Sequence, residues 1–125
     1  MIIREAQMQV LQAAAREKFL KRLMAHFIEV WPEQVKDLGD NYREVIERGV
    51  AKALNYDIAA EQCIARYLNL WFVWGVEFED NPEFEWAKEI LEDPSRPQHL
   101  KAHQLSWRTK KELEMHENSL KESRR

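Results

Sequence analysis

The sequence has one cysteine, three glycines and four prolines among its 125 residues. A single cysteine excludes an internal disulfide and any zinc site built from several thiolates. So few glycines and prolines argue against an all-β chain, which needs many tight turns. The net charge is only −3, so a dedicated duplex-DNA binder, whose surface is strongly basic, is disfavoured.

Long hydrophobic runs are also missing. The most apolar run covers residues 67–76, whereas a membrane-spanning helix needs about 20 apolar residues. The N-terminal residues do not combine a basic segment with an apolar stretch, so we expect no secretory signal. We therefore expect a cytoplasmic protein without a membrane segment, in which one reduced cysteine is ordinary.

The sequence does have helical periodicity over most of its length. Apolar residues between Ile3 and Trp31 recur in alternating steps of three and four. This spacing predicts a long helix over 3–30, ended or followed by a new short turn at Pro32. The same heptad-like seam can pack inside a bundle or against a second copy of the chain, so a homodimer is one possible assembly.

Three shorter segments carry further helix signals. Apolar spacing predicts helices over 42–54 and 59–74. Asn81 as a cap and Pro82 as a first residue predict a fourth helix, which ends before Pro94. This helix is expected to bury Trp86, Ala87, Ile90 and Leu91. We expect an all-α fold: a bundle of about four core helices over residues 1–94.

The last part of the chain has a different composition. Residues 95–125 hold few apolar positions among good helix formers, which predicts a polar C-terminal helix or extension whose end, 117–125, frays. Charge also separates along the chain: residues 77–93 have eight acidic and one basic side chain, and residues 94–125 have eight basic and four acidic. These blocks can face solvent, pair with each other or bind a partner.

The side chains that could carry chemistry do not form a convincing site. His99 and His103 share a helix face, but the intervening residues lack the glutamate of zinc proteases, and Lys101 repels a cation. The acidic residues of 77–85 lack the central glycine of a calcium loop. Cys63 is expected to be a small buried side chain. We expect no metal, no cofactor, no catalytic residue and therefore no enzyme.

The five tryptophans are the most informative residues. Trp31, Trp71, Trp74 and Trp86 fall on helix faces expected to form the core. Aromatic side chains are also enriched at the centres of protein interfaces. Trp107 differs because its helix is otherwise polar, so it either docks that helix on the bundle or anchors a partner.

A protein-binding surface is therefore the main expectation for a functional site. Its candidate residues lie on the last helix, at the end of the third helix and in the acidic segment: Trp107, Leu100, His103, Trp71, Trp74, Glu77, Glu79, Asp80 and Glu83.

Several motifs between residues 27 and 94 resemble those of a known group of proteins. They are Ala65-Arg66-Tyr67-Leu68-Asn69-Leu70, Phe72-x-x-Gly75-x-x-Phe78 and Pro82-x-x-x-Trp86-Ala87-x-x-Ile90-Leu91-x-Asp93-Pro94, preceded by Phe27-x-x-x-Trp31-Pro32, Leu38-Gly39 and Val45-Ile46-x-x-Gly49. The chain is similar over about residues 3–94 to small helical proteins of Gram-negative bacteria. These proteins are encoded beside type VI secretion genes for spike proteins (VgrG, PAAR) and effector-loading adaptors.

This resemblance implies an accessory role and brings no catalytic residue with it. The implied protein is an adaptor or co-chaperone that helps to load an effector onto the spike, with an effector, adaptor or spike protein as its partner. An immunity-type protein, whose acidic block covers the basic active site of a toxin, is the alternative. A structural homo-oligomer is a second alternative. We expect no nucleic-acid partner, since only the basic tail favours one.

Overall fold

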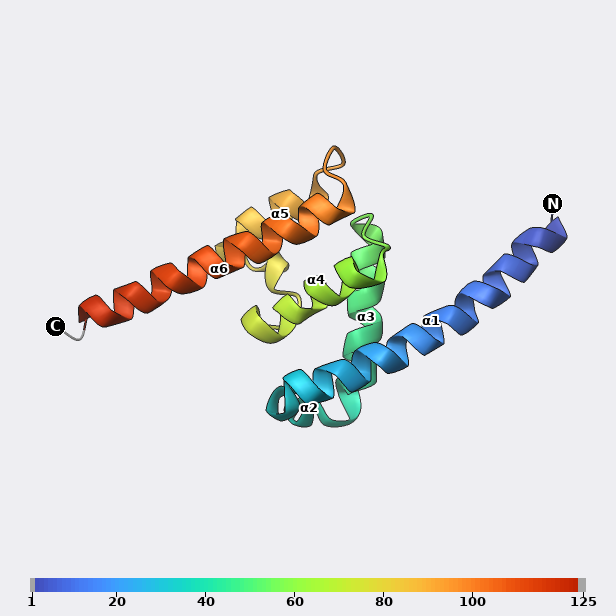
Figure 1. Cartoon of the computed structure of the whole chain (residues 1–125), viewed down its shortest axis with the longest axis horizontal. Helices are drawn as coiled ribbons and strands as arrows, with labels where there is room; N and C mark the ends of the chain where they lie inside the picture. Colours follow the sequence, from blue (N-terminus) through green and yellow to red (C-terminus); the bar gives the residue numbers. More distant parts are fainter. Residues whose placement is uncertain (1, 124–125) are drawn as a thin grey trace. The chain divides into compact units, whose positions relative to one another are not determined.

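Figure 1 shows the computed structural model, which describes the backbone of residues 2–123 and the side chains of residues 13–117. All regular structure in that part of the chain is helical, so the expected all-α fold is confirmed. The α-helices are α1 (Ile2–Val30), α2 (Pro32–Leu38), α3 (Tyr42–Asn55), α4 (Glu61–Trp74), α5 (Glu85–Glu92) and α6 (Gln98–Ser123). Short 3₁₀ turns are η1 (Gly39–Asn41), η2 (Phe78–Asp80) and η3 (Pro82–Phe84).

The chain divides into two compact units, residues 1–52 and 53–125. The helix α3 runs through the boundary between them. This division differs from the expected one after residue 94, because α6 packs against both α4 and α5 within the second unit.

In the first unit, polar contacts fasten α1 to α3. The Tyr42 hydroxyl donates a hydrogen bond to the backbone carbonyl of Met24 at 2.7 Å, and burial raises the pKa of Tyr42 to about 12. About two turns earlier on α1, Glu17 accepts a hydrogen bond from the Arg43 guanidinium at 2.6 Å, which lowers the pKa of this carboxyl group. The apolar contribution of α1 lies between these points, at Leu20 and Leu23, and about one turn after them, at the fully buried Phe27.

The chain turns sharply on either side of α2. Pro32 opens this helix, in agreement with one of the two outcomes expected for it, because proline suits a first helical position. Gly39 ends it with a positive φ of 55° and donates its N–H to the carbonyl groups of Val35 and Lys36. Because ψ is −131° at the same time, this conformation is strained for a residue with a side chain, and it favours glycine.

The core of the second unit forms where α4, α5 and α6 meet. Their buried faces contribute Tyr67 and Leu68 from α4, Leu91 from α5 and Leu105 from α6. The Gln98 side-chain carbonyl accepts hydrogen bonds from the backbone N–H groups of Ala59 (2.8 Å) and Ala60 (2.7 Å), so it holds the starts of α4 and α6 side by side.

The predicted cap at Asn81 exists, but it serves a different helix. The Asn81 side chain accepts a hydrogen bond from the Glu83 N–H at 3.0 Å, with Pro82 at the first position, yet these residues start the 3₁₀ turn η3. Phe84 interrupts the helical backbone with φ −110° and ψ 33°, and α5 begins only after it. The Phe84 ring contacts those of Trp74 and Phe78, with centroids at 5.0 and 5.3 Å, which explains why it turns inward.

Helix α6 lies along α4 and α5 with its first half and continues past them (Figure 1). Its buried residues are Lys101, Ala102, Leu105 and Thr109, which is the spacing of one helix face. After Thr109, no side chain that the structure describes in α6 is buried. The expected fraying of 117–125 falls mostly on residues whose side chains are outside the described part. None of the described helices is both long and apolar enough to span a membrane.

Candidate protein-binding surfaces

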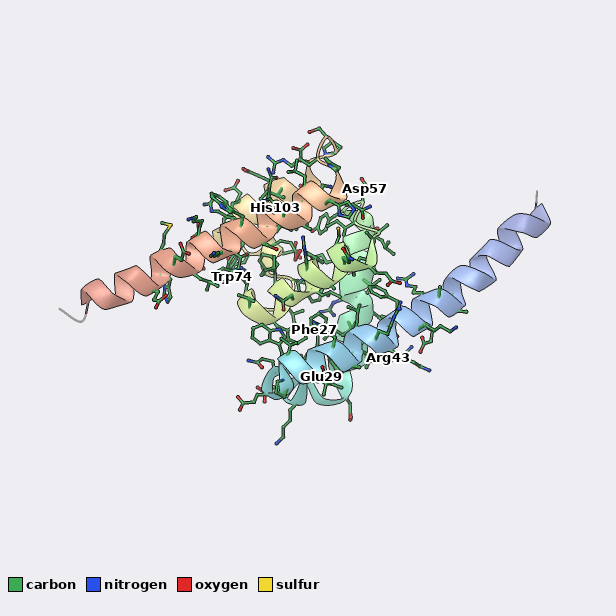
Figure 2. All side chains as sticks on the ribbon, viewed as in Figure 1. Phe27, Glu29, Arg43, Asp57, Trp74 and His103 are labelled. Carbon is green, nitrogen blue, oxygen red and sulfur yellow. The ribbon has the colours of Figure 1, made fainter. Side chains whose placement is uncertain are left out.

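The predicted site residues on α6 are accessible. Trp107 is 56% exposed and Leu100 is 40% exposed. His103, labelled in Figure 2, is also exposed. These three residues lie on the side of α6 that points away from its buried face, as expected from the helical period.

Two other predicted site residues belong to the core and cannot contact a partner in this fold. Trp71 is 3% exposed, and its ring meets that of Tyr67 with centroids 5.8 Å apart. Glu79 is 2% exposed, and its carboxylate accepts a hydrogen bond from the Tyr67 hydroxyl. Burial, and then the Glu79 charge, raise the pKa of Tyr67 well above its usual value. A buried carboxylate is costly without such a donor, so this bond explains why Glu79 turns inward.

The rest of the predicted acidic surface is divided. Asp80 forms an ion pair with Lys88 at 2.7 Å, and this hydrogen bond raises the pKa of Lys88. Glu77 is half-buried and has a positive φ of 55°, whereas Glu83 is exposed. With Glu79 buried, the segment does not present a continuous acidic surface, although its sequence is almost entirely acidic and aromatic.

Trp74 fastens two helices together. Its indole N–H donates to the Thr109 hydroxyl at 3.2 Å, which joins the end of α4 to the middle of α6 (Figure 2 labels Trp74). The contact of its ring with Phe84 adds the turn before α5. Trp74 therefore stabilises the packing of α4 against α6, although its side chain is only half-buried.

A groove between α5 and α6 was not predicted from the sequence. It has a volume of about 270 Å³, and Trp86, Ile90 and Trp107 supply its apolar lining. The sequence suggested that Trp86 and Ile90 would be buried, but both are only half-buried because they face the groove. The Arg108 guanidinium lies over the Trp86 ring, 5.3 Å from its centroid. This is the geometry of a favourable cation–π interaction.

The two sides of this groove carry opposite charges. On α5, Glu89 lines the groove and the exposed Glu85 lies one turn before it, and we call these two residues the acidic wall. On α6, Arg108 lines the groove and the exposed Lys111 lies about one turn after it, and we call these two residues the basic wall. Arg96, which precedes α6, also lines the groove and is paired with Asp93. Both side chains of the basic wall have an ion pair within α6, to Glu112 at 2.8 Å and to Glu114 at 3.7 Å. Such exposed pairs contribute only about 0–1 kcal/mol, so an incoming carboxylate can replace them.

The second exposed surface is residues 110–117 of α6, which we call the α6 arm. Leu113 is 44% exposed and Met115 is 64% exposed. No residue of the arm is buried, and only Glu112 is as much as half-buried. The arm is thus a stretch of helix that carries apolar side chains but contributes nothing to the core.

The cysteine of the chain, Cys63, is buried in the second unit. Cys63 is 1% exposed, as expected, and its Sγ lies 3.4 Å from His99 Nδ1. Among the described side chains, no three histidine, cysteine, aspartate or glutamate residues are grouped as ligands for a metal ion.

The fold and these surfaces define an all-α protein with exposed apolar helix surfaces. A comparison with protein-family models, curated proteins and solved structures finds no match to the chain.

Proposed function

We propose that this chain is a non-catalytic protein-binding factor and that the α6 arm is the element that binds its partner. The observation that carries the proposal is the exposure of Leu113 and Met115 on a helical segment without a buried residue. Leu113 and Met115 lie about 160° apart around the helix axis, so a partner that buries both must enclose the arm, as a groove encloses a bound helix.

The low intrinsic stability expected for the arm also supports a role in partner binding. Helices of fewer than about 12–15 residues are marginal in water, and most helical stability in proteins comes from packing. Two ion pairs in the arm or next to it, Arg108–Glu112 and Lys111–Glu114, are spaced so that they support the helix. Each contributes only about 0.2–0.5 kcal/mol. A partner that packs on Leu113 and Met115 would supply the missing support.

The absence of catalysis is part of the proposal. It is supported by the use of Cys63 in the core and by the pairing of Tyr67 with Glu79 away from solvent. Burial shifts the pKa values of such groups, and groups with shifted pKa values are candidates for catalysis. The side chains of Cys63, Tyr67 and Glu79 are, however, inaccessible to a substrate.

The setting that we propose is type VI secretion, on the strength of the resemblance of residues 3–94. The chain would act in the cytoplasm as an adaptor or co-chaperone, and its partner would be an effector, another adaptor or a spike protein. An immunity-type role has less support, because it relies on the acidic segment, of which Glu79 is buried and Asp80 is paired with Lys88.

The proposal is tested by affinity capture from the native host with the tagged chain as bait. The wild type should recover a secretion component in a fixed ratio. The variant Leu113→Ser/Met115→Ser should lose it, and Val76→Ser, which changes an apolar side chain that is 40% exposed outside the arm, should keep it. Equal recovery by all three baits would contradict a role for the arm, and recovery of a toxin that the chain inactivates would favour immunity.

A further inference from the structure

The α5–α6 groove is an apolar site with walls of opposite charge. Its lining residues Trp86 and Ile90 are half-buried, and Trp107 is 56% exposed at its edge. We propose that a second copy of this chain binds across this groove, related to the first by a two-fold axis that runs along the groove. This inference goes beyond the proposed function and does not depend on it, because it is argued from the groove and not from Leu113 and Met115, although Lys111 belongs to both the arm and the basic wall.

The charges of the groove favour a second copy over other partners. A two-fold axis along the groove places α6 of each copy opposite α5 of the other. The basic wall, Arg108 and Lys111, then faces the acidic wall, Glu85 and Glu89, and this match occurs twice. A partner surface of one charge sign would be attracted by one wall and repelled by the other.

The apolar side chains fit the same arrangement. With α6 of one copy over α5 of the other, Trp107 is directed at the half-buried faces of Trp86 and Ile90 across the interface. Protein interfaces typically have aromatic side chains at their buried centre and polar or charged side chains at their rim. The interface would therefore cover the exposed tryptophan and would leave its charged neighbours at the rim.

The dimer leaves part of the α6 arm available. Leu113 follows Trp107 by six residues, which on a helix of 3.6 residues per turn places it about 120° around the axis from the groove side. Each dimer would thus present two Leu113 side chains, one from each arm. If both arms bind one partner, the second contact gains from the effective concentration that the first provides.

Charge reversal of whole walls tests this arrangement. Glu85→Lys/Glu89→Lys gives a chain with two basic walls, and Arg108→Glu/Lys111→Glu gives one with two acidic walls. All four side chains are exposed, so both variants should fold, and circular dichroism checks that they do. Light scattering should give about 30 kDa for the wild type, twice its 15.0 kDa, and about 15 kDa for each variant alone.

A one-to-one mixture of the two variants tests whether the walls act through their charge. Every wall of one variant then meets a wall of opposite sign, so the mass should return to about 30 kDa, or two copies of 15.0 kDa. The pairing of α5 with α6 is tested by the wild-type dimer itself, because α5 against α5 would place like charges together and repel. A mixture that stays monomeric, or variants that stay dimeric alone, would overturn the proposal. A wild type that remains monomeric at 100 μM would also overturn it.

A single substitution gives an independent measurement. Trp107→Ser should weaken association of the wild-type chain at least tenfold, whereas Leu113→Ser, a matched change outside the groove, should leave it unchanged. Equal effects of the two would overturn the proposed interface. If the wild type is monomeric but still captures a partner, the dimer is refuted and the proposed function stands. If it is dimeric but captures no partner, the proposed function is refuted and the dimer stands.

Discussion

The hydrogen bond between Tyr67 and Glu79 gives the sharpest prediction about stability. Both side chains are buried, at 1% and 2% exposure, and the phenol donates to the carboxylate. This contact ties η2, the first turn after α4, back to the middle of that helix. The perturbation that isolates it is Tyr67→Phe, which removes the hydroxyl group and keeps the ring and its contacts with Trp71.

The magnitude follows from the burial and charge of the pair. A hydrogen bond to a charged group contributes about 1.5–3 kcal/mol, and loss of a buried donor costs more than loss of an exposed one because water cannot replace it. We expect Tyr67→Phe to lower the free energy of unfolding by about 2–3 kcal/mol. Glu79→Met should cost less, because it also removes a buried charge.

The assay is a double-mutant cycle in urea. Tryptophan fluorescence reports mainly on the second unit, which contains four of the five tryptophans. The double variant Tyr67→Phe/Glu79→Met should lose less free energy of unfolding than the sum of the two single variants, by about 1.5–3 kcal/mol of coupling. A coupling energy under about 0.5 kcal/mol would refute the argument that this bond holds Glu79 in the core.

Three further predictions concern other contacts. Gln98→Ala should destabilise the second unit by about 1–2 kcal/mol, because the backbone N–H groups of Ala59 and Ala60 lose their acceptor. An unchanged urea midpoint would contradict a stabilising role for these two hydrogen bonds. Leu91→Ala should cost about 2–5 kcal/mol, since Leu91 is fully buried, and a loss below 1 kcal/mol would show that α5 is loosely packed. Tyr42 has a pKa raised to about 12, so its contribution to stability is complete below pH 10, its ordinary value, and is lost as the pH rises through 12. Tyr42→Phe should therefore flatten the pH dependence of stability between pH 10 and 12, and an unchanged profile would contradict the assignment.

Most of the helical architecture could be predicted because apolar spacing determines it. The predicted helix over 3–30 is observed as Ile2–Val30, and that over 42–54 as Tyr42–Asn55. The 3₁₀ turns before α5 could not be predicted in this way. They depend on Phe84, which leaves the helical conformation so that its ring can contact Trp74 and Phe78, and such tertiary contacts have no local sequence signal.

The candidate surfaces were less accessible to sequence reasoning. Trp107 was identified because it is an aromatic residue on a polar helix, and the structure places it at the edge of the groove. Glu79 was assigned to an acidic surface because charge counts do not give the direction of a side chain. Its inward turn depends on a tyrosine twelve residues earlier. Trp86 and Ile90 were assigned to the core because they share one helix face, but only Ala87 and Leu91 of α5 are buried.

The central claim is that the α6 arm becomes packed only when a partner binds. Hydrogen exchange followed by mass spectrometry measures this directly, on the chain alone and on the complex recovered by affinity capture. In the chain alone, amides of residues 110–117 should exchange much faster than those of 101–109, whose helix face is buried, and partner binding should slow them strongly. Equal rates for the arm in the free chain and in the complex would contradict the claim.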